Sequence, residues 1–222
     1  MNFESPPQPQ INIESDFQDF IPEEFLSNPL EYFEKNGHNI KPGVKHFDQK
    51  GTFEDPDATK DLPVWHNSQN EELHTVGKKV NITKAQVGKS GDPFHEYSVM
   101  EIAKEFGLPA PTPIAKVEHN NEYLIIMKKV EGIRWTDEGM KPIHESNLTD
   151  EDKKNLLSEA EKMVADIAQK YERIGLHRKW KMKDMIFEVD IPNKKVLSVI
   201  PTDWEGTEIN TKELEEARIN KV

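Results

Sequence analysis

The strongest local signal in this chain is one long amphipathic helix that begins after Thr149. Thr149 can cap the helix because Asp152 follows three residues later, which is the spacing of a capping box. Apolar residues then recur at helical spacing, namely Leu156, Leu157, Ala160, Met163, Val164, Ile167, Ala168 and Tyr171. The helix leads directly into Gly175 and a polar loop, so the fold must place that loop at the C-terminal end of the helix.

Shorter periodic segments on both sides of this helix predict a mixed fold. Residues 80–87 alternate and are rich in branched side chains, which predicts a strand with Val80, Ile82 and Lys84 on one face. The same patterns predict a helix over 95–106, strands over 114–118 and 123–127, and a hairpin of strands 185–189 and 196–200. Residues 211–220 can form one short helix. The predicted fold class is therefore α+β.

The first 60 residues differ in composition from the rest of the chain. They carry acidic clusters, repeated prolines and scattered apolar residues, a composition that does not bury a core on its own. We predict a partly ordered tail over 1–60, with short helical turns at 21–26 and 29–33, where proline and acidic residues suit a first helical turn. Packing of these turns on the chain's own domain is favoured over binding of a partner protein.

Charge and composition exclude several classes of function. The chain has a net charge of -12 and no cysteine, so disulfides, thiolate zinc sites and cysteine nucleophiles are excluded. Binding to a nucleic-acid backbone is disfavoured because phosphate contacts need a basic face. No apolar run reaches the roughly 20 residues of a membrane span, and the N-terminus lacks the blocks of a signal peptide. We therefore expect a cytoplasmic protein, or one released in soluble form without a classical signal peptide, and no membrane or nucleic-acid partner.

Two polar motifs follow the long helix. The loop that starts at His177-Arg178-Lys179 ends at Asp184, and Asp203-Trp204-Glu205 follows the predicted hairpin. These motifs resemble the His-Arg-Asp-x-x-x-x-Asn catalytic loop and the metal-binding aspartate of the protein-kinase-like superfamily, with Lys179 in place of the first Asp and Asp184 in place of Asn. Residues 107–111, Gly-Leu-Pro-Ala-Pro, are similar to a connection in the RIO-type and aminoglycoside-phosphotransferase-like branches.

The resemblance covers residues 80–206 and implies an architecture. This is a minimal two-lobed protein-kinase-like fold, with an N-lobe over 61–130 and a truncated C-lobe over 131–222. The C-lobe is truncated because too few residues follow Asp203 for the helices that bind peptide substrates in ordinary protein kinases.

The resemblance also implies cofactors and site residues. ATP and Mg²⁺ would bind, with Lys84 on the nucleotide phosphates and Glu96 holding Lys84 by an ion pair. Ile82 would face the adenine, and backbone groups of a hinge at Met127, Lys128 and Lys129 would contact the adenine edge. Asp184 and Asp203 would hold the metal because Mg²⁺ takes hard oxygen ligands; the alternative is that they are ordinary turn and strand-end carboxylates. The implied catalytic residues are Lys84, Glu96, Lys179, Asp184 and Asp203.

Lys179 divides the functional hypotheses. The family's aspartate accepts the proton of the attacking hydroxyl, which a protonated lysine cannot do. A lysine can still offset charge on the transferred phosphoryl group, so the first hypothesis is an atypical ATP-dependent phosphotransferase. The second is a pseudokinase that binds nucleotide or acts as a scaffold through a protein partner, and the third is an enzyme that transfers another part of the nucleotide. His177 is expected to be a structural residue packed beneath the site.

Overall fold

The chain folds into two compact units of mixed α and β structure. The structure, a computed structural model, describes residues 10–13, 23–28, 31, 38–39, 64–67, 75–80, 91–119, 122–137, 139–204 and 206–220. The first unit comprises Met1–Tyr97 and Thr112–Lys129, and the second comprises Ser98–Pro111 and Val130–Val222. Among the described residues, no helix has the length and apolar character needed to cross a membrane.

The first unit contains a six-stranded sheet with strand order β1-β5-β6-β4-β3-β2. Its strands are β1 (Gln10–Ile13), β2 (His38–Asn39), β3 (Val64–Asn67), β4 (Thr75–Val80), β5 (Pro113–His119) and β6 (Glu122–Lys128). Each pairing between neighbours is antiparallel. The centre of β6 is a run of branched residues that are at most 1% exposed, Leu124, Ile125 and Ile126. These residues suit a strand that is covered on both faces.

Strands β5 and β6 confirm the predictions for 114–118 and 123–127, and the predicted order of a helix followed by these two strands is also confirmed. The strand predicted over 80–87 lies mostly outside the described residues, because β4 ends at Val80 and residues 81–90 are not described. Ile82 and Lys84 fall in that segment. Helix α1 (Glu23–Ser27) confirms the helical turn predicted at 21–26.

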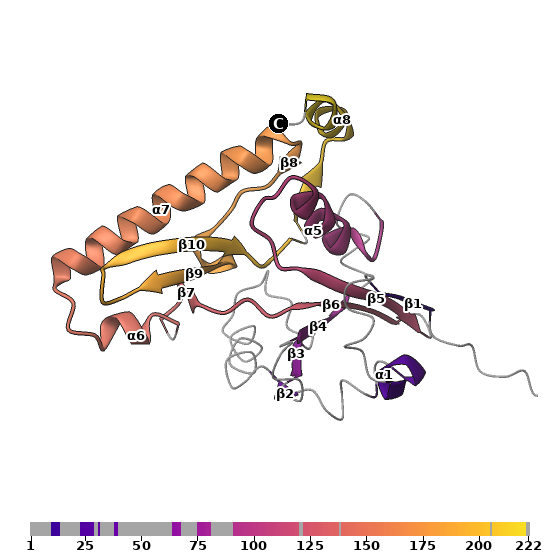
Figure 1. The fold of residues 1–222 in the computed structure, drawn as a ribbon, viewed down its shortest axis with the longest axis horizontal. Coiled ribbons are helices and arrows are strands. Elements are labelled where there is room, and N and C mark those ends of the chain that lie inside the picture. Colours follow the sequence, from indigo (N-terminus) through magenta and orange to yellow (C-terminus); the bar gives the residue numbers. More distant parts are fainter. Residues whose placement is uncertain are drawn as a thin grey trace, which may run out of the picture. The chain divides into compact units, whose positions relative to one another are not determined.

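Part of the acidic, proline-rich N-terminal segment belongs to the sheet. Strand β1 lies beside β5 (Figure 1), with Ile11 opposite Val117 and Ile13 opposite Ala115. Ile11 and Ile13 are half-buried while the alternate residues of β1 are exposed. This four-residue segment with alternating polarity therefore forms a strand by pairing with β5, which is far away in sequence.

Helix α5 (His95–Glu105) confirms the helix predicted over 95–106, and the division between the two units falls within it. Asp92 stabilises the chain just before the helix, because its Oδ1 accepts a hydrogen bond from the Phe94 N–H at 2.8 Å. The helix stops at Gly107, whose φ of 65° is a left-handed conformation that favours glycine.

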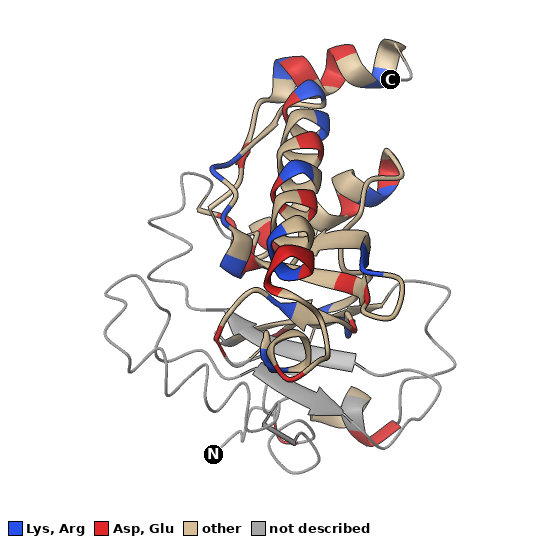
Figure 2. Cartoon of the chain, turned by 90° about the vertical axis from the view of Figure 1, so that its left-hand side faces the viewer, with Lys and Arg blue, Asp and Glu red and all other residues tan. Residues whose placement is uncertain are grey.

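The second unit is built around the long helix α7 (Asp150–Arg173), which lies along the hairpin of β9 (Met185–Asp190) and β10 (Lys195–Pro201) (Figure 1). The predicted capping box is confirmed, with Thr149 Oγ1 accepting from the Asp152 N–H and Asp152 Oδ2 accepting from the Thr149 N–H, both at 3.1 Å. Val196 N–H donates to Glu159 at 2.9 Å and ties β10 to the helix. Acidic and basic residues both occur along the length of α7 (Figure 2).

Short elements complete the second unit. Strand β7 (Ile133–Arg134) pairs with β9, and β8 (Leu176–His177) pairs with β11 (Glu208–Ile209). Helix α6 (Lys141–His144) precedes α7, a 3₁₀ turn η2 (Met182–Asp184) precedes β9, and α8 (Thr211–Asn220) confirms the short helix predicted near the C-terminus. The described residues thus bear out the predicted α+β class.

Gly175 is required where α7 turns into β8, and replacing it with alanine is expected to destabilise the protein. Its φ is 78°, and a Cβ would lie 2.6 Å from the Asn210 carbonyl oxygen. Gly107 is a matched control, because its φ is 65° but a Cβ there would have no described atom within 4 Å. We expect Gly107→Ala to lower the free energy of unfolding by about 1–2 kcal/mol through the left-handed backbone alone. Gly175→Ala should cost clearly more in urea denaturation; equal costs would show that the contact with Asn210 relaxes freely.

Candidate functional site

The hairpin geometry brings two predicted metal ligands together. Asp184 immediately precedes β9, and Asp203 follows β10 by two residues. Because β9 and β10 are antiparallel and Met185 pairs with Pro201, the start of one strand and the end of the other meet at the same edge. Thr202 reinforces this junction, since its N–H and its hydroxyl both donate to the Asp184 carbonyl oxygen, at 2.9 and 3.1 Å.

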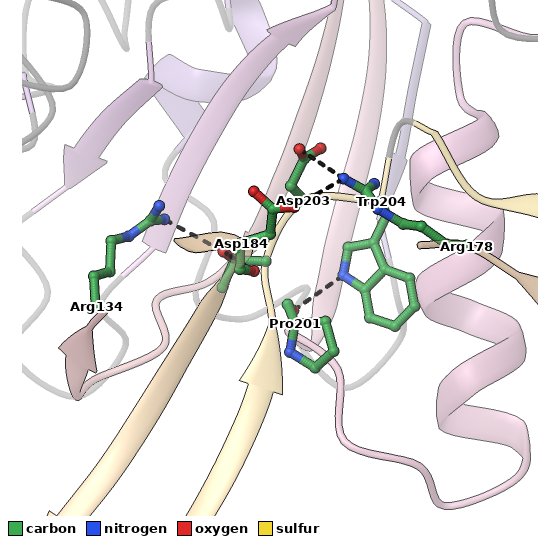
Figure 3. A network of polar contacts seen from close by, with 7 residues as sticks. Arg134, Arg178, Asp184, Pro201, Asp203 and Trp204 are labelled. Atoms are coloured by element: carbon green, nitrogen blue, oxygen red, sulfur yellow. Dashed lines mark hydrogen bonds and ion pairs between the residues drawn. The ribbon is translucent and has the colours of Figure 1, made fainter. Parts of the chain in front are cut away.

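Arg178 bridges the two carboxylates. Its Nη2 donates to Asp203 Oδ2 at 2.9 Å and lies 3.5 Å from Asp184 Oδ2 (Figure 3). The Arg178 and Asp184 side chains are only 11% and 12% exposed, whereas the Asp203 side chain is 44% exposed. One guanidinium nitrogen therefore contacts both carboxylates, one nearly buried and one open to solvent.

Electrostatics couple the two carboxylates. Burial raises the pKa of the Asp184 carboxyl group, and the neighbouring charge of Asp203 raises it further. Arg178, Lys183 and Lys181 act in the opposite direction on the same pKa. The pair thus carries like charges that a cation stabilises.

A second arginine, Arg134, belongs to this cluster and was missed by the sequence analysis. Its Nη2 donates to Thr202 Oγ1 at 3.4 Å, and in Figure 3 it lies on the opposite side of the carboxylate pair from Arg178. Burial lowers the pKa of the Arg134 guanidinium, while the charges of Asp203 and Asp184 raise it. Arg134 reaches the site through the pairing of the two-residue strand β7 with β9, which no local sequence pattern indicates.

An aromatic cluster links the loop to the long helix. The Trp180 and Trp204 ring centroids are 5.1 Å apart, and both rings pack on Tyr171 of α7, at 5.4 and 5.2 Å. Trp204 is completely buried, and its Nε1–H donates to the Pro201 carbonyl oxygen at 3.1 Å. The Arg178 guanidinium carbon lies 5.2 Å from the Trp180 ring centroid, within cation–π range. Trp180 in the loop and Trp204 beside Asp203 are thus both in contact with α7.

Two other polar residues have structural contacts near this loop. His177 Nε2 lies 2.5 Å from Glu213 Oε2 of α8, and both side chains are about two-fifths exposed, at 41% and 42%. His177 thus has a structural partner, as expected, but its side chain is partly exposed and contacts Glu213 of α8 rather than being packed beneath the site. Tyr171 donates a hydrogen bond from its hydroxyl to the Pro109 carbonyl oxygen, and burial raises the pKa of its phenol.

The remaining predicted site residues are placed separately. Lys179 is exposed in the loop that follows β8. Glu96 of α5 is 5% exposed, Met127 of β6 is 7% exposed, Lys128 is exposed and Lys129 is half-buried. Glu96, Met127, Lys128 and Lys129 belong to the first unit, whereas Asp184 and Asp203 belong to the second. The predicted ion pair of Glu96 with Lys84, and the predicted role of Ile82, lie outside the described residues.

The residues that come together fit a divalent cation as a two-carboxylate site. The part of the chain that the structure describes holds no group of three or more His, Asp or Glu side chains suited to a metal ion. Asp184 and Asp203 do converge on one cationic group, the Arg178 guanidinium. Mg²⁺ is commonly held by one or two carboxylates together with waters and substrate phosphates, so this donor set is chemically sufficient.

Comparison with known proteins does not identify a family. No family model matches the sequence, and a search of curated proteins finds no significant match.

Proposed function

We propose that this protein is an atypical ATP-dependent phosphotransferase with a minimal two-lobed kinase-like fold. The observation that carries the proposal is the convergence of Asp184 and Asp203 on a single cation at one edge of the β9–β10 hairpin. The resemblance of the loop and of the Asp-Trp-Glu motif to the kinase-like pattern implies two oxygen ligands close enough to hold one metal ion.

In this proposal each part of the chain has a separate task. Asp184 and Asp203 hold Mg²⁺, which when bound offsets the charge of the nucleotide phosphates. Lys84, oriented by Glu96, binds the phosphates, while Ile82 and the hinge at Met127, Lys128 and Lys129 hold the adenine. Lys179 supplies a positive charge beside the transferred group. It does not take the role of the proton acceptor, which a protonated lysine cannot fill.

A specific observation favours a second candidate, a pseudokinase. Arg178 already pairs with both carboxylates, and Lys179 replaces the residue that would accept the proton. A site of this composition can bind a nucleotide without turning it over. The protein would then act through a protein partner that responds to its nucleotide-bound state.

The experiment that tests the proposal incubates the purified protein with ATP, once with Mg²⁺ and once with EDTA. Intact-mass spectrometry detects a group added to the protein, and chromatography detects ADP, AMP and phosphate. Magnesium-dependent release of ADP supports a phosphotransferase, whereas an added nucleotide mass indicates transfer of another part of ATP. A nucleotide-dependent rise in melting temperature without products supports the pseudokinase, and no binding at all overturns both.

Lys179→Ala is expected to lower magnesium-dependent turnover modestly, and Lys179→Arg is expected to retain most of it. Lys179 is exposed, so its charge acts through water, where two unit charges 4 Å apart interact by about 1 kcal/mol. This corresponds to a rate change of about fivefold, measured as kcat for ADP release. An increase in kcat for Lys179→Ala would contradict the electrostatic role.

A further inference from the structure

We propose that Arg178 occupies the cation position between Asp184 and Asp203 in the metal-free protein, so that a divalent metal must displace its guanidinium to bind. The inference rests on the proposed function and concerns the regulation of the same site. Arg178 acts here as an internal counter-ion that competes with the metal.

The contacts of Arg178 are the first support. A single nitrogen, Nη2, lies 2.9 Å from Asp203 Oδ2 and 3.5 Å from Asp184 Oδ2. A magnesium ion bound to both of these oxygens needs each of them at about 2.0–2.1 Å, so it would lie in the space between them that Arg178 Nη2 occupies. The two positive charges would also repel strongly at such a separation. Metal and arginine therefore exclude each other at this position.

The environment of the guanidinium is the second support. Arg178 Nη1 is buried and has no hydrogen-bond partner among the described residues. A buried donor without a partner carries a desolvation cost, which offsets part of the stabilisation that the Nη2 contacts give to this position of Arg178. Its cation–π contact with the Trp180 ring, whose centroid lies 5.2 Å from the guanidinium carbon, depends on neither carboxylate. A metal can therefore take over the carboxylates while Arg178 keeps its contact with Trp180.

Lys181 provides a charge-matched control. It lies in the same loop, carries the same charge and lowers the pKa of Asp184, but its side chain is exposed. Lys181→Gln removes one positive charge from the neighbourhood of the carboxylates without vacating the position between them. Arg178→Gln does both.

The test measures binding of Mn²⁺ alone, by the loss of the electron paramagnetic resonance signal of the free ion, with competition by Mg²⁺. Arg178→Gln is expected to bind Mn²⁺ about tenfold or more tightly than the unmutated chain, with Lys181→Gln changing the affinity by only about two- to threefold. Adding Asp203→Asn to Arg178→Gln should abolish the gain. Arg178→Lys keeps the charge but offers a single ammonium group, so its Mn²⁺ affinity should lie between those of the unmutated chain and Arg178→Gln. It replaces Arg178→Gln in the test if circular dichroism shows that Arg178→Gln is unfolded.

The outcomes separate this inference from the proposed function. If the unmutated chain and Arg178→Gln bind Mn²⁺ equally well and Asp203→Asn does not bind it, Arg178 does not compete with the metal. The metal site itself then remains in place. Equal gains in Arg178→Gln and Lys181→Gln also overturn it, because net charge alone then explains the effect. If no variant binds Mn²⁺ with or without ATP, the metal site itself fails, and the proposed function and this inference fail together.

Discussion

Asp203→Asn is expected to lower magnesium-dependent ATP turnover by at least about 100-fold, the scale seen when one preorganised electrostatic group is removed from an active site. Asparagine has nearly the same size and its amide oxygen can still accept a hydrogen bond from Arg178, but it lacks the negative charge that a metal requires. Because the Asp203 side chain is 44% exposed, the fold should survive the change. The measurement is kcat for ADP release, with melting followed by circular dichroism.

Two further variants make this result specific. Asp184→Asn should be clearly milder, because the kinase-like pattern has an amide at that position and the change relieves the repulsion from Asp203 that raises the pKa of Asp184. Asp166→Asn, at an exposed position of α7, should leave turnover unchanged. A loss in Asp184→Asn as large as that in Asp203→Asn would show that both carboxylates are needed as charges. Full activity in Asp203→Asn would remove the proposed metal site.

Trp204→Ala is expected to lower the free energy of unfolding by about 3–5 kcal/mol, the usual cost of deleting a buried large aromatic side chain. Trp204 is completely buried and packs at right angles on both Tyr171 and Trp180, with interplanar angles of 89° and 80°. Because Trp204 is the residue next to Asp203 and packs on Tyr171, its removal leaves a cavity beside α7. Urea denaturation followed by circular dichroism measures the loss, since α7 supplies much of the helical signal.

The conservative change Trp204→Phe separates packing from hydrogen bonding. Phenylalanine keeps an aromatic ring in the cluster but loses the Nε1–H bond to the Pro201 carbonyl oxygen, which is 3.1 Å long. A lost bond of this kind costs about 0.5–1.5 kcal/mol, with a smaller additional cost for the reduced volume. If Trp204→Ala costs no more than Trp204→Phe, the cluster does not depend on ring packing.

The elements that the sequence predicts well are those with local causes. Helix α7 carries its apolar stripe and its capping box within one continuous segment, and both are present as expected. The β9–β10 hairpin likewise joins two apolar strands through a short turn, where Asp190 accepts hydrogen bonds from the backbone N–H and the side chain of Asn193. Because the interacting residues are neighbours in the chain, their pattern can be seen without the fold.

The residues of the candidate site also fall into those that the sequence predicts and those that only the fold brings together. The resemblance of two motifs to the kinase-like pattern singled out Asp184 and Asp203, and the antiparallel register of the hairpin explains why they meet. The kinase-like role of Lys84 and its partners stays a prediction. Arg178 was assigned only a place in the loop motif, since nothing in the sequence shows that one guanidinium reaches two carboxylates separated by many residues.

By itself, the sequence determined the α+β class, the long capped helix, the hairpin and the choice of Asp184 and Asp203 as candidate ligands. The tertiary structure alone decided that β1 joins β5, that Arg134 approaches the carboxylates through β7, and that Trp180, Trp204 and Tyr171 form one cluster. The physical reason is that capping and periodicity act between residues a few positions apart, whereas strand pairing, ring packing and charge neutralisation depend on distances in space that no local pattern records.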